Sequence, residues 1–152
     1  RDAAAMLGQY TPWRQNMTVD LKRYEQFVEQ VTSNPSNNLE AMISRLQVLD
    51  SQPLPLNVSL LMTAGVGLAS EAGELDELIK KMIFQGKPWN EDVKFHMIRE
   101  LGDIIWYWVS ACRAIGVDPN EVVEENVRKL ESRYPGGKFN VHSSENRKDG
   151  DI

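Results

Sequence analysis

The sequence predicts an all-α protein, a bundle of four to five helices that assembles as a homo-oligomer. Apolar residues recur at three- and four-residue spacing along most of the chain, as on one face of a helix. No alternating apolar run with an Asn-Gly or Asp-Gly turn indicates a β-hairpin. Clusters of Pro, Gly, Ser and Asn divide the chain into five helical segments. Its 152 residues correspond to a single domain.

The first two helices are expected over residues 18–32 and 38–49. In the first, Thr18 is the candidate N-cap, and the apolar positions are Leu21, Tyr24, Phe27, Val28 and Val31. In the second, they are Met42, Ile43, Leu46 and Leu49. A turn cluster at 33–38 separates these helices, and Pro53 and Pro55 end the pair.

A long helix is expected from Val58 to Phe84. Gly86 stands near the C′ position and Pro88 just beyond it, which is the usual pattern at a helix C-terminus.

Two further helices are expected over residues 91–115 and 119–133. Asn90 is the N-cap candidate of the former, which ends at Gly116. Asp118 followed by Pro119 gives the latter an N-cap and a proline in its first position, where proline is well tolerated.

Three segments are expected along the chain. Residues 1–16 are an extension or a vector-derived segment, 17–139 form the helical domain, and 140–152 form a polar C-terminal tail. No secretory signal and no membrane span is expected, so the cytoplasm is the expected location.

The composition excludes several classes of function. A net charge of −5 argues against broad nucleic-acid binding, which needs a basic surface. The single cysteine, Cys112, excludes an intramolecular disulfide framework and any multi-cysteine zinc site.

Two of the long helices carry acid pairs at the same spacing. Glu71 and Glu74 lie in the run SEAGEL, and Glu100 and Asp103 lie in ELGD. A spacing of three places both members of a pair on one helix face. On a wheel of about 100° per residue, Glu71 and Glu100 fall within the apolar stripes of their helices, with the second acid of each pair at the edge.

Carboxylates that face a core are costly to ionise unless a cation compensates them, and a cluster of four repels itself. A divalent cation resolves both problems. All-oxygen ligation favours Mg²⁺, with Mn²⁺ as a substitute. The simpler alternative is that each pair lies on a solvated helix face. A di-iron centre is disfavoured, because such proteins use Glu-x-x-His pairs and His96 precedes Glu100 by four residues.

At these residues the sequence resembles the MazG-like all-α nucleoside triphosphate pyrophosphohydrolases. The matching blocks are LASEAGELDELIKK at 68–81, ELGDIIWYW at 100–108 and ENVRKLESRYP at 125–135. Many relatives have Glu-Glu-x-x-Glu, and here Ser70 occupies the first place. The resemblance implies magnesium-dependent cleavage of a nucleoside triphosphate substrate, (d)NTP, to (d)NMP and pyrophosphate. It also implies that Glu71, Glu74, Glu100 and Asp103 hold the metal and act in catalysis.

The remaining phosphates of such a substrate need donors. Lys129 and Arg133 are four residues apart and share a face near a helix C-terminus, where the helix dipole also favours cations. Their match to the family's basic block favours phosphate contact, with Asn126 as an accessory contact. Lys81 lies near the Glu74 edge, where it reaches phosphate or pairs with Glu77.

Candidates for base binding are Tyr107, Trp89 and His96. Tyr107 follows Asp103 by one turn, Trp89 lies in the loop between the acid helices, and His96 lies near the carboxylate face. Aromatic side chains stack on any base, so these residues do not identify a preferred base. We expect Trp108 to pack in the core.

The helix over 91–115 is apolar nearly all round, which is typical of a helix buried in a larger assembly. Ile98, Ile105 and Val109 face away from Glu100, and Trp106 occupies another side. We therefore expect a homodimer or homotetramer.

Alternatives to the main hypothesis are a related dUTP/dCTP or phosphoribosyl-ATP pyrophosphatase, and a non-catalytic helical adaptor with a structural cation.

Overall fold

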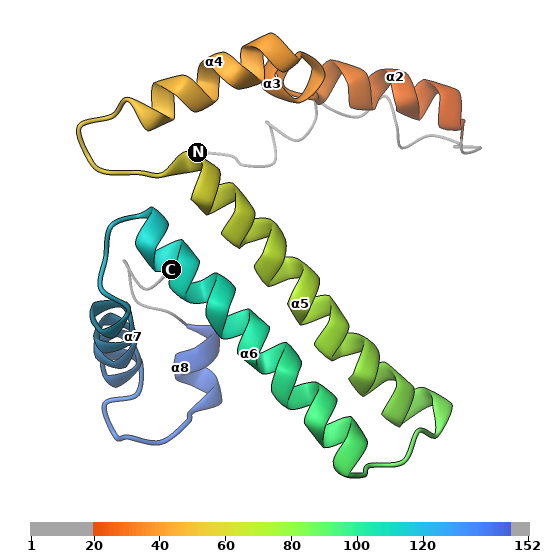
Figure 1. The fold of residues 1–152 in the computed structure, drawn as a ribbon, viewed down its shortest axis with the longest axis vertical. Helices are drawn as coiled ribbons and strands as arrows, with labels where there is room; N and C mark the ends of the chain where they lie inside the picture. The colour runs from red at the N-terminus through yellow and green to blue at the C-terminus, as the bar shows by residue number, and fades with distance from the viewer. Residues whose placement is uncertain (1–19, 147–152) are drawn as a thin grey trace, which may run out of the picture. The chain divides into compact units, whose positions relative to one another are not determined.

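A computed structural model describes residues 20–146. Its secondary structure consists of helices joined by loops (Figure 1). The prediction of an all-α protein is confirmed there, with no strand among the described residues. The helices are α2 (Leu21–Val31), α3 (Asn34–Asn37), α4 (Leu39–Asp50), α5 (Val58–Gln85), α6 (Glu91–Ala114), α7 (Pro119–Arg133) and α8 (Val141–Glu145). The segment 1–16 and candidate cap Thr18 lie outside the described residues.

The structure adds two short helices to the five expected. α3 forms within the predicted turn cluster, with Pro35 in its first turn. α8 forms in the segment expected to be a polar tail, because Asn140 caps it by accepting a hydrogen bond from the Ser143 backbone N–H at 3.0 Å. The cap of α2 is Asp20, whose carboxylate accepts from the backbone N–H groups of Lys22 and Arg23.

The chain divides into two compact units, residues 1–45 and 46–152, with the boundary inside α4. In the described part of the first unit no residue is buried. The apolar stripe predicted for α2 exists, but residues such as Leu21 and Val31 are largely exposed and nothing within the unit covers them.

The second unit is built on α5 and α6, which run antiparallel and side by side (Figure 1). Small residues occupy much of their buried contact, including Ala64, Gly67, Ser110 and Ala114, so the two backbones approach closely. Val93 is the large side chain that is fully buried. The pair of helices therefore forms the rigid frame on which side chains at its centre are positioned.

Both ends of this helical pair are tied down by hydrogen bonds. At one end the Asn57 backbone N–H donates to the Ala114 carbonyl at 2.8 Å, joining the start of α5 to the end of α6. At the other end Gly86 caps α5 in the left-handed conformation, with φ of 69°. Asn90 then caps α6 by accepting from the Val93 N–H at 3.0 Å. The predicted caps Gly86 and Asn90 are both confirmed.

The helix α7 packs against α6 on the side away from α5 (Figure 1). Asp118 caps it, as predicted, by accepting from the Asn120 N–H at 2.8 Å. A cavity of about 400 Å³ lies between α6 and α7. No described helix is long and apolar enough to span a membrane.

Substitution of glycine by alanine should change the free energy of unfolding in opposite directions at Gly86 and at Gly65. Gly86→Ala forces an alanine into the left-handed region and should lower the free energy of unfolding by about 1 kcal/mol. Gly65→Ala adds a methyl group in open space within the helix and should raise it by about 0.5–1 kcal/mol. Urea unfolding measures both, and an equal effect at the two positions would contradict the assigned cap.

Candidate metal centre

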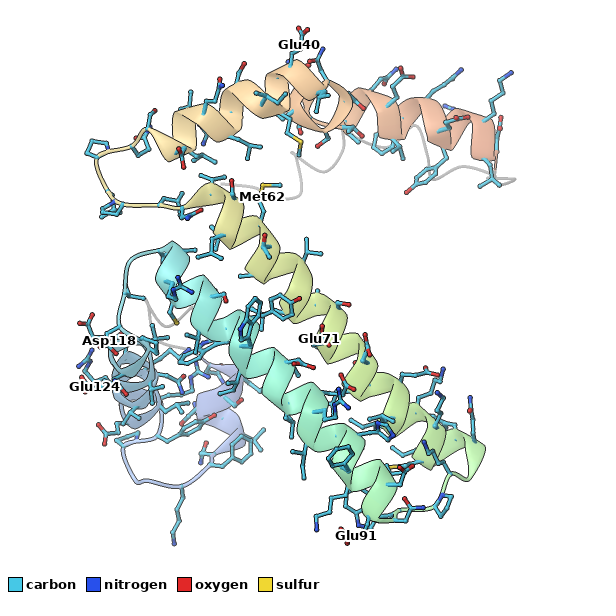
Figure 2. All side chains as sticks on the ribbon, in the orientation of Figure 1. Glu40, Met62, Glu71, Glu91, Asp118 and Glu124 are labelled. Carbon is cyan, nitrogen blue, oxygen red and sulfur yellow. The ribbon has the colours of Figure 1, made fainter. Side chains whose placement is uncertain are left out.

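Three of the four predicted metal ligands meet where α5 runs alongside α6. Carboxylate oxygens of Glu71, Glu74 and Glu100 all lie within 4.8 Å of one another. Figure 2 labels Glu71 at this place, between the two helices. Glu71 and Glu100 are half-buried in the helix contact, whereas Glu74 is exposed. The cluster thus has one side in the protein and one side open to solvent.

Asp103, the fourth predicted ligand, lies beside this cluster. Its side chain is exposed, and its charge acts on Glu71. It is outside the group of three whose oxygens come within 4.8 Å of each other. The arrangement is therefore a compact triad with one further acid at its edge.

The electrostatics of Glu71 show what this crowding does. Partial burial raises the pKa of Glu71, and the negative charges of Glu74, Asp103 and Glu100 raise it further. Side-chain hydrogen bonding with Glu100 raises the pKa of Glu71 as well. Every interaction that shifts this pKa favours the neutral form.

Glu77, two turns along the same helix, shows the opposite behaviour. Hydrogen bonds from Lys80 and Lys81 lower the pKa of Glu77, and the Lys81 ammonium lies 3.3 Å from its carboxylate. Lys81 is therefore engaged with Glu77, as one of the two sequence-based interpretations expected. The pKa values of Glu71 and Glu77 shift in opposite directions because further acids surround Glu71, whereas two lysines pair with Glu77.

A divalent cation fits this donor set. The ligand atoms are all carboxylate oxygens, which suits the hard cations Mg²⁺ and Mn²⁺. A cation would offset the mutual repulsion of these carboxylates. The open side, with Glu74 and Asp103, leaves room for water and phosphate oxygens to complete the coordination.

The residues predicted to bind phosphate lie on a different helix from the acids. Asn126 and Lys129 line the cavity between α6 and α7. The other residues that line it are Trp108, Val122, Val123 and Glu125. None of the four acids lines this cavity. Arg133 is half-buried at the end of α7.

The residues predicted to bind a base are not brought together. Trp89 is 58% exposed in the loop between α5 and α6. His96 is exposed, with Nε2 3.6 Å from the Asp92 carboxylate. Tyr107 is half-buried, one turn from Asp103, with its ring edge-on to Trp106 at 4.8 Å between centroids. Of these three, Tyr107 is the one that lies in the α5–α6 contact near the acids.

Two residues have roles that sequence reasoning missed. Trp108, expected in the core, is half-buried and lines the α6/α7 cavity. Gly67, one turn before Glu71, lies against the Tyr107 ring. A glycine inside a long helix is unfavourable and often serves close packing, but a Cβ at Gly65 or Gly73 of the same helix would meet nothing within 4 Å, so the sequence does not single out Gly67.

The raised pKa of Glu71 predicts how stability depends on pH in metal-free protein. Since the folded state holds this proton more tightly than the unfolded chain, the associated stability is fully present below the ordinary pKa of 4.5. It is lost as the pH rises through the raised value towards neutrality. Glu71→Gln should therefore reduce the loss of stability between pH 4.5 and pH 7 in EDTA, measured by urea unfolding.

The matched control is Glu91→Gln, on the exposed first turn of α6. It should keep the wild-type pH dependence. The same pH dependence in Glu71→Gln as in wild type would show that the acids are not coupled as described.

The comparisons with known proteins agree with this geometry. The family model described as the MazG nucleotide pyrophosphohydrolase domain matches residues 62–137, half of the chain. The match includes the acid pairs of α5 and α6 and the basic residues of α7. No curated protein and no solved structure matches the chain. With two acid helices side by side and this match across them, the chain belongs to the MazG nucleotide pyrophosphohydrolase family.

Proposed function

We propose that this protein hydrolyses nucleoside triphosphates, (d)NTP, to (d)NMP and pyrophosphate with Mg²⁺ as cofactor. The observation that carries the proposal is the carboxylate triad of Glu71, Glu74 and Glu100 within a nucleotide pyrophosphohydrolase domain. Adding one water across the anhydride between the α and β phosphates accounts for both products. Such chemistry needs positioning and charge neutralisation more than a covalent nucleophile.

The roles of the acids follow from their placement. Glu71, Glu74, Glu100 and Asp103 would hold the metal, which supplies neutralisation of charge on the phosphate oxygens. Glu71 and Glu100 are fixed by the helix contact, so they are suited to anchoring. Glu74 and Asp103 are exposed at the open side, so either is placed to orient the attacking water and take its proton.

We retain the cationic and polar residues of α7 as candidates for contact with the remaining phosphates; within one chain they lie on the side of α6 away from α5, and none of the four acids lines their cavity. Lys129 and Asn126 both line the cavity between α6 and α7. Arg133 continues the same helix one turn later. Lys81 joins them only if it leaves Glu77. For the base, we retain Tyr107, Trp89 and His96 as candidates, with the cytoplasm as the location of the reaction.

A close relative acting on dUTP, dCTP or phosphoribosyl-ATP is the alternative within the same chemistry. It shares the acids and differs in the pocket that selects the base. A non-catalytic adaptor with a structural cation is the alternative outside it. A screen of pyrophosphate release over the eight common NTPs and dNTPs, with Mg²⁺ and with Mn²⁺, separates these alternatives.

Loss of one metal ligand should abolish most of the activity. Glu74→Gln and Glu100→Gln should each lower kcat/KM for pyrophosphate release at least about a hundredfold, because metal neutralisation contributes several kcal/mol and each 1.4 kcal/mol is a factor of ten. The helical circular dichroism should persist, since Glu74 is exposed and Glu100 half-buried.

Glu91→Gln is again the matched control, the same substitution at the far end of α6, where Glu91 faces Lys94 at 3.5 Å (Figure 2). It should retain wild-type activity. Wild-type protein that releases no pyrophosphate from any of the eight nucleotides, with either metal, would support the adaptor.

We also propose that the protein is a homodimer or homotetramer. On α6, Ile98, Leu101 and Ile105 form a stripe at helical spacing and are 57%, 52% and 59% exposed. A stripe of large apolar side chains left in water is typical of an interface between subunits. A second copy of the chain carries the same stripe, so a two-fold contact covers both.

A charge in this stripe should dissociate the assembly. Ile105→Glu should shift the mass in light scattering from a multiple of 17.3 kDa to the monomer at low micromolar concentration, because burying an unpaired carboxylate costs several kcal/mol. Leu54→Glu, at a more exposed apolar residue in the loop after α4, should leave the mass unchanged. A stable wild-type monomer at that concentration would contradict the proposal.

A further inference from the structure

A close contact between α5 and α6, that of Gly67 with Tyr107, lies near the carboxylate cluster. A Cβ atom built on Gly67 would come within 2.1 Å, 2.3 Å and 2.4 Å of Cε1, Cδ1 and Cζ of Tyr107. All three distances are at least 1 Å short of ordinary contact, which begins at 3.4 Å. The Tyr107 ring therefore occupies the volume that any side chain at position 67 would need.

The ring cannot yield to such a side chain by a small movement of its tip. One of the three atoms is Cδ1, next to the point where the ring joins the rest of the side chain. The ring is half-buried, and the indole of Trp106 stands edge-on to it at 4.8 Å. A methyl group at position 67 must therefore either push the helices apart or expel the whole ring.

This contact is one helical turn from the acids on both helices. Gly67 precedes Glu71 by four residues, and Tyr107 follows Asp103 by four. Because the helices run antiparallel, the same step of about 6 Å along the axis leads from the contact to the acids on either helix. A change in helix separation at Gly67 is thus passed to Glu71 and Asp103, one turn away, and to Glu100, one turn further along α6.

We infer that Gly67 and Tyr107 are positioning residues for the metal, because their contact sets the α5–α6 separation at which Glu71 and Glu100 grip one cation. This inference rests on the proposed function, in which the cation is bound. The ligand oxygens lie within 4.8 Å of one another, so a shift of about 1 Å is a large part of their spacing. Position 67 needs a glycine to allow this helix separation. The backbone conformation there does not need one, because the residue lies within a regular helix.

Mn²⁺ binding to the full-length, substrate-free protein tests the inference by calorimetry or electron paramagnetic resonance. Gly67→Ala should weaken Mn²⁺ binding about ten- to a hundredfold, the range typical of lost support for metal ligands. The matched control is Gly65→Ala, on the same helix, where a Cβ meets nothing within 4 Å. It should bind Mn²⁺ as the wild type does. Equal affinity in wild type and a folded Gly67→Ala overturns the inference.

A double-mutant cycle separates this role from a general loss of stability. Tyr107→Leu removes the ring that the new methyl group meets, so Gly67→Ala should have little further effect on Mn²⁺ affinity in that background. This arm also decides the question if Gly67→Ala alone does not fold. A double variant that fails to fold, or that loses Mn²⁺ binding relative to Tyr107→Leu, overturns the inference. Failure of the proposed function is distinct, because then the wild type itself binds no Mn²⁺.

Discussion

The structure depends on the close contact of α5 and α6. Small buried residues along these helices let their backbones approach, and the same approach brings three carboxylates to within 4.8 Å of each other. Packing and repulsion therefore oppose each other at one place. Burial of apolar surface holds the helices together. The raised pKa of Glu71 shows that the neighbouring acids disfavour its ionised form. A bound cation would offset that repulsion.

Much of the architecture was predictable, because helix periodicity and capping are local. Asn90, Gly86 and Asp118 act as the sequence indicated, and the four long segments from 39 to 133 are helices close to their expected ends. The departures are also local in origin. Asp20 caps α2, and Asn140 starts a short helix in a segment judged only by its polarity.

The site was predictable in part, for a reason that lies in geometry. Spacing on a wheel shows which face of its own helix Glu71 occupies, but it does not show which residue of α6 lies opposite. The register between helices depends on side-chain contacts such as Gly67 with Tyr107, which no single-helix pattern contains. For the same reason, the sequence did not show that Lys129 shares a cavity with Trp108 on the far side of α6 from α5.

The short connection between α5 and α6 has a consequence for how the protein folds. Residues 86–90 are all that separates the two acid helices, so the candidate metal ligands all lie within one helical hairpin. Contacts between segments joined by a short loop need little loss of chain entropy and form rapidly. We expect the carboxylates to meet early in folding, before α7 docks. On the proposed function, a nascent chain would then begin to bind divalent cations once this hairpin has emerged, with α7 still to be made.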